Sequence, residues 1–182
     1  MTPLEDCLIQ LNAATADREK GAAYIKENPE SFKELFQLAC SEKQERTHMV
    51  AAWVLEKYTL DQLDQLSPLV AEFLKGVAQQ KHESKRRPMI KLLYHYCKDQ
   101  KRRAELTHHE RDQIIVLCFD YMLKAKKVAA LAFSMKTLHF FRKHQPWIED
   151  ELHAYIEQRL PNSSAGFRSV VRQISRNSRK DC

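Results

Sequence analysis

Histidine and cysteine are the side chains here best suited to bind a transition metal, and the chain has eight of one and five of the other. A metal site needs several such ligands close together. His108 and His109 are adjacent and so point about 100° apart on a helix. His139 and His144, at i and i+5, do not share a helix face either. No two cysteines have the C-x-x-C spacing of metal or redox sites. The sequence therefore predicts no metal site, no cofactor and no disulfide framework.

Motifs for phosphate binding and nucleophilic catalysis are missing from the sequence. Gly21, Gly76 and Gly166 are isolated, so no glycine-rich phosphate loop exists. No serine or cysteine lies in a recognisable nucleophile elbow. The sequence leaves catalysis open but favours a protein that is not an enzyme.

Basic residues at helical spacing are the feature that suggests binding. Arg87, Lys91 and His95 recur every four residues and define one face of an expected helix over 83–98. Equivalent positions in the flanking repeats hold further basic and aromatic residues, and the last helix adds two arginines. The predicted binding face comprises Trp53, Lys57, Arg87, Lys91, His95, Lys136, Phe140, Arg168 and Arg172.

The arginines of the last helix have two interpretations. Phe167, Val170 and Ile174 supply its apolar contact, while Arg168 and Arg172 lie on another face. Those arginines either bind an anion or form the polar outer surface that the final repeat of an array requires. The second interpretation is favoured.

Composition and charge point to helices with an uneven charge distribution. Only 3 glycines and 6 prolines occur in 182 residues, which favours long helices over turn-rich sheets. Residues 1–80 have 8 basic against 13 acidic residues, whereas residues 81–182 have 22 against 11. The basic half could attract an anionic partner, or it could simply be a well-solvated surface.

Helix pairs recur along the sequence. The apolar stripe Ala51-Val54-Leu55-Tyr58 matches Met89-Leu92-Leu93-Tyr96 at an offset of 38 residues, close to the period of about 40–47 residues of HEAT-type repeats. These stripes are expected to be core. Five pairs can be marked, over 3–12 with 17–28, 29–41 with 44–58, 68–79 with 83–98, 107–123 with 126–144, and 147–160 with 164–176.

The second half also carries a likeness to a known family. The residues are Val128, Ala129, Phe133, Met135 and Leu138, then Pro146, then the run from Ser164 to Ser169. Over about two thirds of its length the chain resembles small bacterial HEAT-like repeat proteins. The resemblance implies a right-handed, armadillo-like α-α superhelix, in a group mostly without established activity.

Some similar sequences carry an adenylosuccinate lyase label. That enzyme has a Ser-Ser-x-Met-Pro-type catalytic loop, whereas this chain offers only Ser163-Ser164-Ala165-Gly166. The sequence does not support this activity.

The expected molecule is an all-α scaffold of about five HEAT-like pairs, forming a single domain over 1–176 with a disordered tail over 177–182. We expect a monomeric, cytoplasmic protein without a membrane segment that binds a protein or peptide on a concave surface. The alternative is binding of the nucleic-acid backbone through a basic groove, by analogy with HEAT-like DNA glycosylases. The analogy is at the level of fold, because no catalytic Asp can be placed in this sequence.

Overall fold

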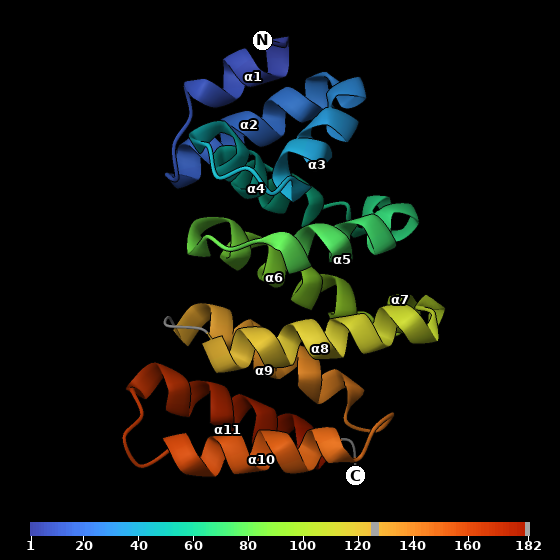
Figure 1. Ribbon diagram of the computed structural model, residues 1–182, viewed down its shortest axis with the longest axis vertical. Coiled ribbons are helices and arrows are strands. Elements are labelled where there is room, and N and C mark those ends of the chain that lie inside the picture. The colour runs from blue at the N-terminus through green and yellow to red at the C-terminus, as the bar shows by residue number, and fades with distance from the viewer. Residues whose placement is uncertain (125–127, 181–182) are drawn as a thin grey trace. The chain divides into compact units, whose positions relative to one another are not determined.

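The chain folds into helices that form two compact units (Figure 1). The computed structural model describes residues 1–124 and 128–180, and it contains no strand within those residues. The units are Met1–Tyr96 and Cys97–Cys182, and their boundary lies inside helix α6 (Glu83–Lys98). The sequence predicts a single domain over 1–176, and whether the two units form one domain stays a prediction.

The first unit is built around helix α4. This helix packs against α1, α2 and α3 and supplies much of the buried surface. The elements of the unit are α1 (Pro3–Ile9), α2 (Thr15–Glu27), η1 (Pro29–Ser31), α3 (Phe32–Cys40), α4 (Arg46–Thr59), η2 (Leu63–Leu69), α5 (Val70–Gln79) and most of α6.

The apolar stripes predicted from the sequence are core, as expected. Every member is at most 3% exposed, and the same spacing buries one face of each helix. The two stripes are Ala51, Val54, Leu55 and Tyr58 on α4, and Met89, Leu92, Leu93 and Tyr96 on α6.

The second unit is built around helix α9. Helices α8, α10 and α11 all pack against it, and its Met135 and Leu138 are fully buried. Tyr155 Oη donates a hydrogen bond of 2.8 Å to the Met122 carbonyl and so ties α10 to α8. The elements are α7 (Gln100–Glu105), α8 (His108–Lys124), α9 (Val128–Phe141), α10 (Trp147–Arg159) and α11 (Ala165–Lys180).

Most predicted helix ends lie within a few residues of the observed ends, with three corrections. Pro29 and Pro68 do not open α-helices; both lie in short 3-10 segments, a usual form of the entry to a helix. Helix α7 was not predicted, although Asp99 marks its start by accepting a hydrogen bond of 2.9 Å from the Arg102 amide. Helix α11 reaches Lys180 and residues 181–182 lie outside the described chain, so the state of the tail stays a prediction.

Two glycines allow close contacts between helices of the first unit. A Cβ on Gly76 would lie 2.6 Å from Cβ, 2.8 Å from Sγ and 3.0 Å from Cα of Cys40. A Cβ on Gly21 would lie 2.4 Å from a methyl carbon of Val54. These separations are shorter than van der Waals contact, so any side chain there would push α5 away from α3, or α2 away from α4.

The carboxyl end of α3 is closed by two buried polar side chains. Helices end with carbonyl groups that lack partners within the helix. Gln80 Nε2 donates to the carbonyls of Cys40 and Ser41 at 3.2 and 3.1 Å, and to that of Gly76 at 2.8 Å. Lys85 Nζ donates to the carbonyls of Ser41 and Lys43 at 2.7 and 3.1 Å. Because Lys85 belongs to the first turn of α6, these bonds fix the start of α6 against the end of α3.

Lys85 is fully buried and has a strongly perturbed amine. Burial lowers the pKa of its ammonium group from 10.5 to about 8, and the nearby Cys40 acts weakly in the opposite direction. The same burial raises the pKa of the Cys40 thiol from 9.0 to about 12. Cys40 is therefore a protonated core residue, as its position in an apolar helix indicates.

We predict that Gly76→Ala destabilises the first unit. Alanine adds helix propensity of about 1 kcal/mol, but overpacking against Cys40 costs about 1–3 kcal/mol and its backbone cannot move aside easily. Gly166→Ala is the matched control, since its Cβ would meet only Val128 and Ser164 atoms at 3.5 and 3.7 Å. Urea unfolding should show a loss of stability for Gly76→Ala and no loss for Gly166→Ala. Equal effects of the two changes would contradict the close contact.

We also predict a distinctive pH dependence for Lys85. Between about pH 8 and 10.5 the unfolded chain holds this proton while the native amine has released it, so this group's contribution to stability rises with pH. The difference in unfolding free energy between the wild type and Lys85→Met should therefore grow in favour of the wild type from pH 7 to pH 9. The slope is at most about 1.4 kcal/mol per pH unit.

Gln80→Leu is the control for this experiment. It removes hydrogen bonds to the carbonyls of Cys40, Ser41 and Gly76 without removing a titratable group, so its cost should be nearly the same at each pH. A wild-type minus Lys85→Met difference that stays constant or falls over the range would contradict the pKa of Lys85.

Candidate functional site

Trp53 links helices α4 and α6 of the first unit. Its side chain is half-buried, and the indole Nε1 donates a hydrogen bond of 2.8 Å to the Ser84 carbonyl at the start of α6. The hydrogen bond fixes the ring between α4 and α6 and leaves part of it at the surface. Trp53 is thus both a structural residue and an available aromatic contact.

Two of the predicted lysines are engaged in ion pairs. Lys57 Nζ lies 3.0 Å from a carboxylate oxygen of Glu19 on α2. Lys91 Nζ contacts the carboxylate of Glu56 on α4, and Glu56 is only 7% exposed. The Glu56 side chain is largely removed from water while that of Lys91 is 31% exposed, so the pair crosslinks α6 to α4 at the edge of the core. Neither lysine offers a full positive charge to a partner.

Arg87 is the exposed cation of this surface. It lies three residues after Ser84, and therefore on the side of α6 that faces the Trp53 indole. His95 lies two turns further on and is half-buried, with its ring edge-on to Tyr94 at a centroid distance of 5.0 Å. The α4–α6 face, defined by Trp53, Lys57, Arg87, Lys91 and His95, is therefore of mixed charge with an aromatic component.

In the second unit, Lys136 and Phe140 lie one turn apart on α9. The Arg103 guanidinium lies over the Phe140 ring at 4.8 Å, so this aromatic face is already covered by a cation. Burial lowers the pKa of Lys136, and the nearby Lys98 lowers it further. Two lysines close enough to affect each other form a small cationic cluster.

Arg168 and Arg172 on α11 have different surroundings. Arg168 Nη2 donates to the Ser163 carbonyl at 2.9 Å and so braces the turn that leads into the helix. Arg172 is exposed, and Phe167, Val170 and Ile174 are buried at 7% exposure or less. The choice between an anion site and a polar outer surface for these arginines stays a prediction.

The nine predicted residues fall into two groups. Five lie together on the α4–α6 face of the first unit, and four lie on α9 and α11 of the second. Their role in binding stays a prediction, and the sequence did not predict Glu19 and Glu56, the acidic partners of the lysines. Glu56 follows Val54 and Leu55 directly, so its burial depends on packing that spacing alone does not reveal.

The chain matches the family model for the HEAT repeat domain over residues 10–178. The chain belongs to the HEAT-repeat family. This match and the all-helical structure confirm the expected fold of HEAT-like antiparallel helix pairs. No curated protein and no solved structure matches the chain significantly.

HEAT repeats form helical scaffolds, often for protein interaction. Among the described residues, no group of three or more His, Cys, Asp or Glu side chains could hold a metal ion. Nor is any described helix of the HEAT-repeat chain long and apolar enough to cross a bilayer. Burial raises the pKa of the Cys97 thiol to about 12, which makes it a poor nucleophile. The absence of cofactor and catalysis stays a prediction.

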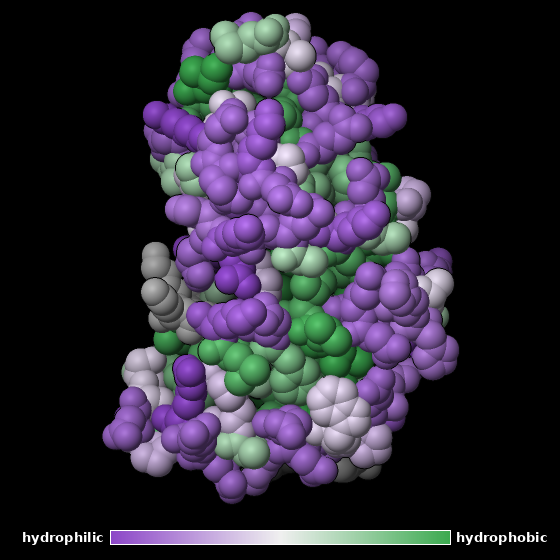
Figure 2. All heavy atoms as spheres, in the orientation of Figure 1, coloured by the Kyte–Doolittle hydropathy of each residue, from purple (hydrophilic) through white to green (hydrophobic). Residues whose placement is uncertain are grey.

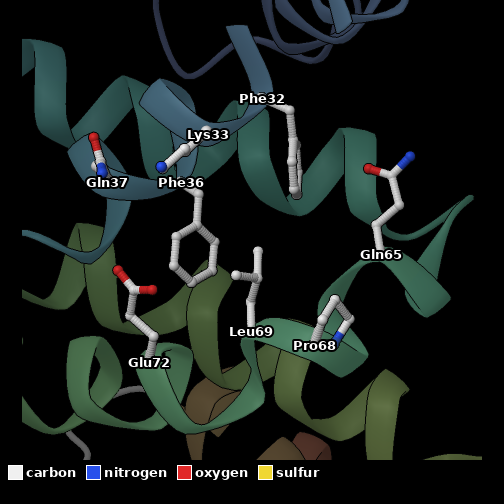
Figure 3. Close-up of a pocket in the computed structure, with 8 residues that line it drawn as sticks. All are labelled: Phe32, Lys33, Phe36, Gln37, Gln65, Pro68, Leu69 and Glu72. Carbon is white, nitrogen blue, oxygen red and sulfur yellow. The ribbon is translucent and has the colours of Figure 1, made fainter. Parts of the chain in front are cut away.

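The sequence also did not predict a groove between helices α3 and α5 of the first unit. The α3–α5 groove has a volume of about 410 Å³. In Figure 3 the rings of Phe32 and Phe36 descend from α3 towards Leu69 and Pro68. Lys33 and Glu72 at its edges carry opposite charges. The lining residues are Phe32, Lys33, Phe36, Gln37, Gln65, Pro68, Leu69 and Glu72.

The spacing of Phe32 and Phe36 could have identified one wall of this groove, since i and i+4 share a helix face. The other wall depends on η2, whose 3-10 path brings Pro68 and Leu69 under α3. Nothing in the sequence pattern predicts that path.

We predict that Lys91 is needed for stability. Lys91→Met leaves the buried Glu56 carboxylate without this partner and should cost about 1–3 kcal/mol in urea unfolding. Arg87→Met, at an exposed position one turn earlier on the same face, should change stability by no more than about 0.5 kcal/mol.

A double variant tests whether the cost arises from an unpaired charge. Combining Glu56→Leu with Lys91→Met should recover most of the stability, because neither charge then remains buried. A double variant as unstable as Lys91→Met alone would show that packing, and not the ion pair, carries the effect.

Proposed function

We propose that this HEAT-repeat protein is a non-catalytic scaffold that binds a protein or peptide partner on its second helices, which we expect to form a concave surface. The observation that carries the proposal is the mixed character of the α4–α6 face. Lysines neutralised by carboxylates, an exposed arginine and a half-buried tryptophan resemble a protein interface, where Trp and Arg are the most frequent anchors.

Binding of a nucleic-acid backbone is the weaker candidate. It depends on cations that are free to replace counterions along the phosphates. Lys57 and Lys91 would first have to leave Glu19 and Glu56, and the second of these exchanges would expose a buried pair. The neighbouring Lys98 and Lys136, with the exposed Arg172, are the features of the second unit that favour this alternative.

The proposal also includes a monomeric, cytoplasmic protein. It draws on the odd, scattered cysteine set, which fits a reducing compartment. Burial of Cys40, Cys97 and Cys118 agrees with thiols that serve as core residues.

We predict that a partner can be captured from the α4–α6 face by site-specific photocrosslinking. A benzophenone amino acid at position 87 should give a discrete crosslinked protein in cells of the source organism, since Arg87 is exposed beside Trp53. The same amino acid at position 79, exposed on α5, is the control and should not give that product. Equal products from both positions would contradict binding at this face.

Fluorescence anisotropy with labelled single- and double-stranded oligonucleotides tests the alternative. Non-specific binders reach only about 10⁻⁴–10⁻⁶ M at physiological salt, so the titration should start at low ionic strength. Arg87→Glu is the variant to compare, because changing Lys91 would disturb the fold. Tight binding that falls steeply with salt and is lost in Arg87→Glu would replace the protein-binding proposal by nucleic-acid binding.

A further inference from the structure

The second unit exposes apolar side chains along one stripe of α8. Val116 is 68% exposed and Leu123 is 63% exposed, and Phe119 lies between them at helical spacing. Trp147, at the start of α10, is 47% exposed. Single exposed apolar residues are common, but a contiguous group of them marks an interaction surface.

These side chains line a groove of about 710 Å³ between α8 and the start of α10. Figure 2 shows hydrophobic atoms gathered on this face of the second unit at the level of α8, whereas the surface over α10 is mostly hydrophilic. The α8–α10 groove is lined by Asp112, Ile115, Val116, Phe119, Asp120, Leu123, Gln145, Trp147 and Glu151.

Trp147 is held in place within the groove. Its ring stacks on Phe119 with centroids 5.3 Å apart and planes 24° apart. Its Nε1 donates to Gln145 Oε1 at 2.6 Å, and Gln145 Nε2 donates in turn to Asp112 Oδ1 at 3.0 Å. An aromatic anchor whose orientation is already fixed loses little conformational entropy on binding, so it favours affinity.

The rim of the groove is acidic. Asp112, Asp120 and Glu151 are its charged residues, and no described basic side chain lines it. Lys124 pairs with Asp120 from one turn further along α8, so the acidic character of the rim depends on Asp112 and Glu151. By contrast, the α3–α5 groove has Lys33 and Glu72 at its edges and no excess of either sign.

We propose that the α8–α10 groove binds an amphipathic helical segment of a partner protein, with aliphatic side chains on one face and Lys or Arg beside them. Aliphatic side chains would cover Val116, Leu123 and Trp147, and the flanking cations would meet Asp112 and Glu151.

The geometry of α8 favours a helix as the occupant. The stripe from Val116 to Leu123 is about 10 Å long, which matches two turns of a partner helix. The backbone N–H and C=O groups of a helix interior are already bonded within the helix, so the groove has no strand edge to pair with an extended peptide. A partner helix satisfies its own backbone and needs only side-chain contacts.

A second copy of this chain is a poorer occupant. Its α11 has exposed arginine at position 172, but the apolar residues Phe167, Val170 and Ile174 of that helix are buried against its own unit. The exposed face of α11 therefore lacks the aliphatic side chains needed to cover the floor of the groove. The acidic rim equally repels a nucleic-acid backbone.

This surface is separate from the α4–α6 face, and its test does not depend on the proposed function. The probe is a fluorescein-labelled helical peptide of leucine and lysine, with leucine at i, i+3, i+4 and i+7 along one face. A control peptide carries glutamate in place of each lysine. The full-length protein should bind the lysine peptide at least about tenfold more tightly than the glutamate peptide at low salt, and the ratio should fall as salt rises.

Three variants locate the binding. Val116→Asp changes an exposed residue and should weaken binding of the lysine peptide at least about tenfold without loss of the protein's helicity. Glu151→Gln should weaken binding of the lysine peptide about threefold or more and reduce its salt dependence. Leu160→Asp is the matched control, since Leu160 is 41% exposed but does not line the groove, and it should bind as the wild type does.

Tryptophan emission gives an independent readout. The chain has two tryptophans, so Trp53→Phe leaves Trp147 as the reporter. Burial of its indole by the lysine peptide should shift the emission to shorter wavelength. No shift at saturation would place the peptide elsewhere and overturn the proposal.

Other outcomes also overturn it. The proposal is wrong if the lysine peptide does not bind at low ionic strength, if both peptides bind equally, or if Val116→Asp binds as tightly as Leu160→Asp. A dimer in sedimentation analysis that is lost in Val116→Asp would assign the groove to a second copy of the chain. Failure of photocrosslinking at position 87 would affect the proposed function alone.

Discussion

The close approach of α5 to α3 at Gly76 is the constraint on which the first unit depends. Because no side chain separates the helices there, the carbonyl end of α3 comes within reach of Gln80 and Lys85. Lys85 is in the first turn of α6, so the same contact sets where α6 begins. The position of α6 then determines which residues face α4: Ser84 meets Trp53 and Lys91 meets Glu56. The arrangement of the α4–α6 face therefore depends on the absence of a side chain at Gly76.

The fold was largely predictable from the sequence because apolar spacing and helix-pair recurrence are local signals. The stripes around Leu55 and Leu93 identified the core, and helix α6 has the predicted bounds. The chemical character of the surface was not predictable in the same way. Lys91 and Glu56 are far apart in sequence, and each is unremarkable on its own helix. Basic residues at regular spacing therefore indicated a cationic stripe, whereas the structure shows ion pairs.

Net charge is a poor guide to binding in this protein. The chain has a formal charge of +6, concentrated in its second half, yet the α8–α10 groove in that half has exposed apolar side chains and an acidic rim. The lysines expected to bind an anion in the first unit are neutralised locally. What a surface attracts depends on charges within about 8–10 Å, the distance over which salt screens them, and not on the sum over the chain.

Gln80 and Lys85 have a consequence for how related sequences should be read. Both side chains present only N–H groups to a cluster of carbonyl oxygens, so a carboxylate or an aliphatic residue cannot substitute for them without leaving those oxygens unbonded. Selection for folding would keep a donor at each position while surrounding surface residues drift. In a family alignment these two polar positions would then stand out as invariant and invite assignment to a catalytic or ligand site. Their conservation would instead reflect the hydrogen bonds that they donate to the carbonyl groups at the end of α3.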